Sequence, residues 1–260
     1  VITEDKESSL KDIQEEKKLY FLNHPDSIGG RFSVFSVVGL LPASLVNFNI
    51  KKFCGGAKDF LGEIKYGKKF DYFFSPIFNL IKLYEKGINM SIIMPYSDSL
   101  QNLSFWYRQL WAESIGKEGK GITPINSLGT VDQHSQLQLY LDGPRDKFFT
   151  IIGEKKIKKS AKIDCRYSKN KTYINLHKKS LDTLLEAEMM ATIQTIKNKN
   201  LPIRVLILKS LNEKQMGSLM MFFFIETILS CFLLDLNPFD QPAVEEGKKL
   251  TKELLKKENE

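Results

Sequence analysis

Histidine and cysteine are scarce in this chain, which has only three of each in 260 residues. The histidines are His24, His134 and His177, and the cysteines are Cys54, Cys165 and Cys231. No two histidines have the spacing of zinc or iron ligands, and the cysteines form no pair or cluster. The sequence therefore argues against a metal site and against a disulfide framework, and a reducing cytoplasm is the expected location.

An arginine-rich patch and an amino-terminal leader are also lacking. The net charge of +7 comes mainly from lysine runs such as KKIKK and KKLTKELLKKENE, which are typical of solvated surface. Without interleaved arginines and aromatic residues, these runs do not indicate a nucleic-acid partner. The first residues, VITEDKESS, contain no initiator Met and no basic-then-apolar leader. They read like a strand that enters a helix, so we expect further sequence to precede them.

Long hydrophobic runs are few. The main one, at residues 219–234, is shorter than the roughly 20 residues of a membrane span. Glu226 and Thr227 also lie in its middle. A membrane anchor is therefore the less favoured interpretation, and a buried core or interface helix is the favoured one.

The chain does contain apolar strands that alternate with helices. INMSIIMPY is the clearest buried strand, and LYFLN, FFTII and PIRVLIL predict three more. Helices are expected at residues 8–19, 49–67, 76–87, 99–117, 176–200 and 211–237, with a final helix from about Pro242. This order predicts α/β layers around a mostly parallel sheet, which carries its ligand sites at the carboxyl ends of the strands.

The stretch DSIGGRFS combines a glycine pair with an arginine. Gly29 and Gly30 let the backbone approach a ligand closely, and Ser33 opens an expected helix whose amides could bind an anion. Arg31 stands between the two features. The simpler interpretation is a turn followed by a surface arginine.

The expected helix at residues 99–117 ends with a glutamate beside a Gly-Lys loop. Gln109 and Glu113 are four residues apart and share one helical face, while aromatic and aliphatic residues cover the neighbouring faces. A carboxylate held at such a position suits a general base. The alternative is a solvated glutamate at a fraying helix end.

Two further motifs contain candidate site residues. In GTVDQHSQLQLYLDGP, Thr130 and Gln133 have the spacing of a capping box, which places His134 in the first turn of a helix. A structural and a functional role are equally open for this histidine.

In NPFDQPAVEEGKK, Asp240 or Gln241 can cap a helix that has Pro242 in its first turn. Val244 and Lys248 then share one helical face, so Lys248 could project toward a site. The alternative is a solvated lysine in a charged helix.

Taken together and in this order, four stretches resemble the glucose-6-phosphate isomerase family. They are DSIGGRFSVFSVVGLLP, AESIGKEGKG, GTVDQHSQLQLYLDGP and FDQPAVEEGKK. The resemblance covers essentially the whole chain, and the first and last stretches are the family's most specific motifs.

The resemblance implies an α/β fold with a mostly parallel sheet: the flavodoxin-like, three-layer αβα sandwich called the sugar-isomerase (SIS) domain. The family has two such domains. Residues 1–48 would be the carboxyl-terminal remainder of the first domain, and residues 49–69 a helical connection. Residues 70–235 would form the second domain, and residues 236–260 a carboxyl-terminal helix that returns to the site.

The resemblance also implies an enzyme of glycolysis and gluconeogenesis. Family members interconvert glucose 6-phosphate and fructose 6-phosphate through a cis-enediolate, by proton transfer between C2 and C1, without a metal or an organic cofactor. They are cytoplasmic homodimers whose site is shared between subunits. The implied partner is a sugar phosphate, with no nucleic acid and no membrane.

Each motif residue has an implied role. Glu113 matches the base that moves the proton, and Arg31 matches the residue that stabilises the enediolate. His134 matches the acid/base that helps to open the sugar ring and that arrives from the partner subunit. Lys248 matches a lysine near the ring oxygen. The positions that line the substrate match Gly30, Gln109 and Gln241.

Two departures from the family pattern stand out. Pro242 and Ala243 replace a bulkier residue and a glycine, which concerns the entry of the last helix. The family's phosphate-binding Ser/Thr loop precedes the GGR motif, and nothing before Asp26 supplies it. We therefore expect this chain alone to bind substrate poorly. The alternative function is a non-catalytic, phosphosugar-binding SIS module.

Overall fold

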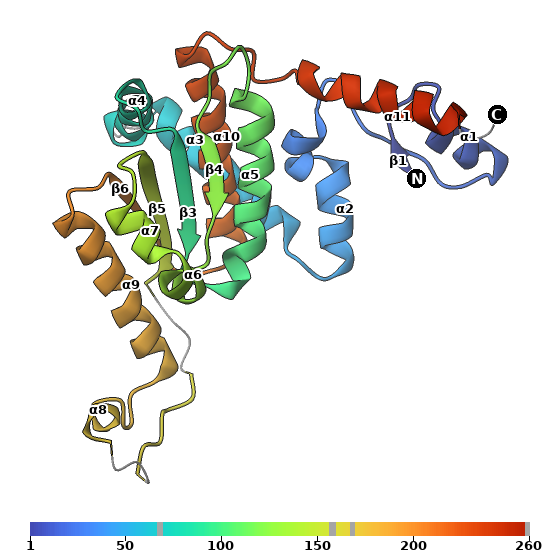
Figure 1. The fold of residues 1–260 in the computed structure, drawn as a ribbon. Coiled ribbons are helices and arrows are strands. Elements are labelled where there is room, and N and C mark those ends of the chain that lie inside the picture. Colours follow the sequence, from blue (N-terminus) through green and yellow to red (C-terminus); the bar gives the residue numbers. More distant parts are fainter. Residues whose placement is uncertain (67–69, 156–159, 167–169, 258–260) are drawn as a thin grey trace.

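The computed structural model describes residues 1–66, 70–155, 160–166 and 170–257 (Figure 1). The elements are β1 (Ile2–Thr3), α1 (Ser9–Glu16), β2 (Leu22–Asn23), η1 (Gly30–Phe35), α2 (Val37–Leu45), α3 (Ile50–Tyr66), α4 (Phe70–Glu85), β3 (Met90–Pro95), η2 (Asp98–Leu100), α5 (Gln101–Ile115), β4 (Thr123–Asn126), α6 (Gly129–Ser135), α7 (Leu137–Asp142), β5 (Lys147–Glu154), α8 (Lys171–Ile174), α9 (Leu181–Asn198), β6 (Ile203–Leu208), α10 (Glu213–Leu233), η3 (Pro242–Val244) and α11 (Glu245–Lys257).

Four parallel strands form the main sheet in the order β4-β3-β5-β6. The chain moves from β3 outward to β4 and then crosses to the other side of β3 for β5 and β6, which is the order of a flavodoxin-like sheet. The predicted parallel α/β sheet is confirmed. Strand β4 was not predicted, because its four residues, TPIN, include a proline and an asparagine that disfavour strands.

Helices cover both faces of this sheet (Figure 1). On one face, α3, α5 and α10 pack around the fully buried side chains of Trp111 and Phe223. On the other face, α7 and α9 pack around Phe149. Within β3, Ile93 belongs to the first cluster and Ile92 to the second, as expected for a strand that is buried on both sides. The three-layer αβα sandwich is confirmed.

Helix α10 contains the apolar run. This helix of 21 residues is long and apolar enough to cross a membrane, and its most apolar stretch of 18 residues has a mean hydropathy of 1.9. Half of that stretch is nevertheless buried inside the protein. Glu226, in the middle of the run, is fully buried and pairs with Arg204 of β6. These contacts support the interpretation of α10 as a core helix.

Three expected element starts differ from the structure. Helix α4 begins at Phe70, so Pro76 lies inside the helix and does not start it. Helix α9 begins at Leu181, because the hydroxyl of Ser180 caps it by accepting a hydrogen bond from the Thr183 amide. The helix expected to start at Ser33 is preceded by a 3-10 helix, η1, which begins at Gly30 and includes Ser33. Of the run KKIKK, four residues lie outside the described residues.

The two ends of the chain lie beside the sandwich. The first residues form a two-stranded parallel sheet, β1 and β2, with α1 nearby. Helix α11 extends away from the main sheet (Figure 1), and its described side chains, including Leu250 and Leu254, are exposed. The boundaries predicted after residues 48, 69 and 235 stay a prediction.

Candidate active site

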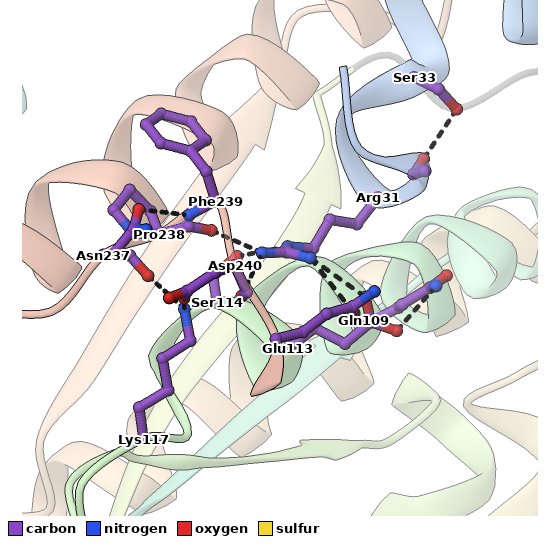
Figure 2. A network of polar contacts seen from close by, with 12 residues as sticks. Arg31, Ser33, Gln109, Glu113, Ser114, Lys117, Asn237, Pro238, Phe239 and Asp240 are labelled. Carbon is purple, nitrogen blue, oxygen red and sulfur yellow. Dashed lines mark hydrogen bonds and ion pairs between the residues drawn. The ribbon is translucent and has the colours of Figure 1, made fainter. Parts of the chain in front are cut away.

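Arg31 is the buried centre of a polar cluster (Figure 2). Its side chain is only 2% exposed. The Nε atom donates to the hydroxyl of Ser114 at 2.9 Å. The Nη2 atom donates to the backbone oxygens of Pro238 and Asp240, at 2.7 and 3.0 Å. Three segments that are distant in the sequence therefore meet at one guanidinium group.

The remaining guanidinium nitrogen, Nη1, faces the expected base. It lies 3.5 Å from Oε2 of Glu113 and 3.4 Å from Oε1 of Gln241. The amide of Gln109 donates to Oε1 of Glu113 at 3.0 Å. Burial lowers the pKa of Arg31 and the Glu113 carboxylate opposes this shift, so the guanidinium remains cationic at neutral pH.

A cleft of about 610 Å³ lies against this cluster. It is lined by the end of α5, the loop at residues 116–120 and the segment 237–244. Glu113 and Gln241 both line it, and the Glu113 side chain is 31% exposed, so its carboxylate is accessible from the cleft. Among the described residues, no group of three His, Cys, Asp or Glu side chains is placed to hold a metal ion. The cleft has the size of a site for a small polar molecule.

Five of the seven expected site residues come together here. Arg31, Gln109, Glu113 and Gln241 form the hydrogen-bonded cluster. Gly30 directly precedes Arg31 and is exposed. A Cβ atom on Gly30 would meet nothing within 4 Å, so the space above its backbone is open to a ligand.

His134 and Glu113 lie at opposite ends of the strands of the sheet. Helix α5 follows β3 and runs back beside it, so Glu113 lies near the amino ends of the strands. Helix α6 follows β4, so His134 lies beyond the carboxyl ends (Figure 1). The capping-box prediction is wrong: Leu128 is the N-cap residue, its amide donates to the carboxylate of Asp132, and His134 is in the last turn of α6. The chain therefore does not bring His134 to Glu113.

Lys248 lies outside the cleft. It is exposed on α11, one helical turn beyond Val244, where the cleft lining of this segment ends. A single chain thus assembles the carboxylate and the guanidinium, but not the histidine or this lysine.

The cluster lies at the other end of the strands from the one where ligand sites were expected. Glu113 and Arg31 meet near the amino ends of the strands, whereas ligand sites were expected at the carboxyl ends. The carboxyl edge does contain a smaller cavity of about 280 Å³, beside the point between β3 and β5 where the strand order reverses. Its lining includes Asp98, Glu154, Asp182 and Glu186. Four carboxylates would repel an anionic ligand.

Sequence reasoning missed two side chains of the cluster. Ser114 accepts the hydrogen bond from Arg31 Nε, and Lys117 forms an ion pair with Asp240. Both follow Glu113 in the stretch AESIGK, so their position beside the expected base was the available signal. Asp240 had been considered only as a helix cap.

The strand order and the two helical layers define the chain as an α/β protein of the SIS class. At the level of sequence, the profile described as phosphoglucose isomerase matches residues 3–260. The chain belongs to the phosphoglucose isomerase family.

Individual relatives agree with this assignment. A probable glucose-6-phosphate isomerase of Methanococcus maripaludis is 38% identical over 250 residues, which are 95% of this chain and 55% of that protein. The glucose-6-phosphate isomerase of Rubrobacter xylanophilus is 36% identical, over 96% of this chain and 59% of its own length. The chain therefore spans just over half the length of these curated relatives.

Solved structures show the same fold. A hypothetical protein from Thermus thermophilus superposes with a TM-score of 0.90 at 30% identity, over 98% of this chain and 62% of that one. A glucose-6-phosphate isomerase from Chlamydia trachomatis gives a TM-score of 0.73 at 22% identity, over 100% of this chain and 52% of that one, which supports the fold alone.

Proposed function

We propose that this chain supplies the proton-transfer residues of an aldose-ketose isomerase that interconverts glucose 6-phosphate and fructose 6-phosphate. One observation supports the proposal above all others: a partly exposed carboxylate, Glu113, faces a buried guanidinium, Arg31, at the edge of a cleft. Removal of a proton next to a carbonyl group requires a positioned base and a group that stabilises the resulting oxyanion.

The proposed chemistry begins at Glu113. Its carboxylate takes the proton from C2 of the open-chain sugar and returns it to C1, so the same group is base and then acid. Between these steps, negative charge develops on the enediolate oxygens. Arg31 stabilises this charge at little reorganisation cost, because Ser114, Pro238 and Asp240 already fix its guanidinium. Gln109 holds the other oxygen of the Glu113 carboxylate.

The proposal also includes His134, supplied by a second subunit, and Lys248, supplied by the last helix. We propose that His134 of a partner subunit opens the sugar ring, because within one chain it lies at the opposite edge of the sheet from Glu113. A homodimer with a shared site follows. We further propose that Lys248 acts near the ring oxygen, and that the protein works in the cytoplasm, where its three free cysteines stay reduced.

Substitution of Glu113 by Gln in the purified native protein tests the proposal. The amide keeps the size of the side chain and its contact with Arg31 but cannot accept the C2 proton. We expect isomerase activity in a coupled assay to fall by roughly 10³-fold or more, with sugar-phosphate binding retained. Glu85→Gln, at the exposed end of α4, is the matched control. Near-normal turnover of Glu113→Gln would reject Glu113 as the base.

A non-catalytic phosphosugar-binding module is the second candidate. This candidate stays open because a fold alone does not fix an activity, and a site of this kind can bind a sugar phosphate without turning it over. Binding of glucose 6-phosphate by the native protein without hydrogen exchange at C2 would support this candidate over the isomerase.

A further inference from the structure

The segment that carries Gln241 is held by two buried cations. From one side, Arg31 donates to the backbone oxygens of Pro238 and Asp240. From the other side, the ammonium group of Lys117 donates to the backbone oxygen of Asn237 and lies 2.5 Å from the carboxylate of Asp240 (Figure 2). The Lys117 side chain is only 9% exposed, which is unusual for a lysine.

The conformation of the loop at residues 116–121 directs the Lys117 side chain toward this segment. It turns back on itself through a bridge between Lys117 and Lys120. Gly119 and Gly121 have positive φ angles of 71° and 133°, which favour glycine. Lys120 donates to the backbone oxygen of Leu234 at the end of α10. A short, defined loop thus fastens the end of the base-bearing helix to the chain that follows α10.

The negative charge of the Asp240 carboxylate lies close to Arg31 and is paired with Lys117. Asp240 binds Arg31 through its backbone oxygen while its carboxylate is paired with Lys117. The hydrogen bond from Lys117 lowers the pKa of Asp240, so the carboxylate is ionised at neutral pH. Without Lys117, this negative charge would be left beside Arg31 and would compete with an enediolate for the guanidinium.

We infer that Lys117 and Asp240 form a latch that positions Gln241 and keeps Arg31 available for the developing oxyanion. The inference rests on the proposed function. Lys117 is a positioning residue: it acts through Arg31 and Gln241 and is not assigned a contact with the reacting atoms.

The kinetic test uses Lys117→Met in the purified native protein. We expect kcat to fall about 10- to 100-fold with a smaller change in KM, because the binding surface remains while the oxyanion stabiliser is misplaced. Lys117→Arg keeps the cation and should recover most of the activity. Asp240→Asn in the Lys117→Met background removes the stranded carboxylate and should restore part of kcat. A wild-type kcat in Lys117→Met would overturn the inference.

Hydrogen exchange tests the latch without reference to catalysis. The amides of Phe239, Asp240 and Gln241 should exchange at least 10-fold faster in Lys117→Met than in the wild type. Lys199→Met is the matched control, since Lys199 pairs with Asp142 at 2.7 Å on the surface. Faster exchange at the three amides is not expected in this control.

The two measurements separate the two claims. If the wild-type protein does not isomerise the sugar, the proposed function is wrong. The latch is then tested by the hydrogen-exchange rates of Lys117→Met alone. If the wild type is active and Lys117→Met exchanges at the wild-type rate, the latch fails alone. Should Lys117→Met not fold, Asp240→Asn replaces it in the exchange experiment, and unchanged rates in that variant would overturn the inference.

Discussion

Arg31 makes hydrogen bonds in three directions that a lysine could not reproduce. Its planar guanidinium reaches Ser114 through Nε, two backbone oxygens through Nη2, and Glu113 and Gln241 through Nη1. A lysine has a single ammonium group on a flexible stem. At the scale of single residues, the geometry of the guanidinium therefore matters as much as its charge.

Substitution of Arg31 by Lys tests this point. Several buried acceptors would lose their donor, so we expect the free energy of unfolding to fall by roughly 2–3 kcal/mol. We also expect kcat/KM to fall about 100-fold, as for the loss of one oxyanion donor. Thermal denaturation and steady-state kinetics measure the two effects. Arg108→Lys, an exposed change on α5, should alter neither; equal effects in both variants would contradict the assignment.

At the scale of elements, α3 and α10 approach each other backbone to backbone. A Cβ atom on Gly56 would lie 1.9 Å from the backbone oxygen of Lys214, and one on Gly217 would lie 1.9 Å from that of Phe53. Only glycine fits at these two positions without a shift of the helices. This close crossing fixes α10 against the sheet and with it the segment that follows α10 into the site.

Gly56→Ala should therefore destabilise the protein by about 1–3 kcal/mol, because the two helices must separate to admit a methyl group. The neighbouring Gly55 is the matched control. A Cβ atom there meets nothing within 4 Å, so Gly55→Ala should stabilise α3 by roughly 0.5–1 kcal/mol. Chemical denaturation checks both values, and the prediction requires opposite signs.

A second element-scale contact is the buried ion pair between β6 and α10. Glu226 is fully buried against Arg204, whose guanidinium also donates to Thr150. Removal of one partner leaves the other charge uncompensated, so Glu226→Gln should cost about 3–5 kcal/mol in chemical denaturation. Lys214→Ala removes an exposed pair with Asp59, and its cost should stay below about 1 kcal/mol. Similar costs for the two variants would contradict this reading of the core.

In the molecule as a whole, Glu113 lies near the amino ends of the strands and His134 lies beyond their carboxyl ends. A site that uses both needs two copies of the chain, arranged so that the carboxyl edge of one meets the cleft of the other. The proposed homodimer follows from this separation, and a mixing experiment tests it.

Glu113→Gln and His134→Ala homodimers should each be nearly inactive. When the two proteins are dissociated and reassociated together, half of the dimers are mixed, and each mixed dimer has one intact site. Activity should then recover to about a quarter of the wild-type value. An affinity tag on one variant, with co-purification of the untagged variant, confirms the exchange of subunits. No recovery after complete exchange would show that each site belongs to one chain.

Parts of the fold could be predicted because their signals are local. The apolar run in β3, which is buried at five of its six residues, and the long apolar run in α10 can each be recognised without knowledge of a packing partner. Strand β4 could not be predicted, because TPIN becomes a strand only by pairing with β3. The start of α4 was misplaced for a related reason: tertiary packing keeps the helix continuous through Pro76.

The layered α/β fold, the family, and the association of an arginine motif with a glutamate at a helix end could all be read from the residues in order. The position of the candidate site near the amino ends of the strands, and the presence of Ser114, Lys117 and Asp240 around it, emerged only from the folded chain. The physical reason is the range of the contacts. Arg31 donates to the backbone oxygens of Pro238 and Asp240, which are 207 and 209 residues away, and no local pattern of side chains encodes which distant backbone oxygens a guanidinium will meet.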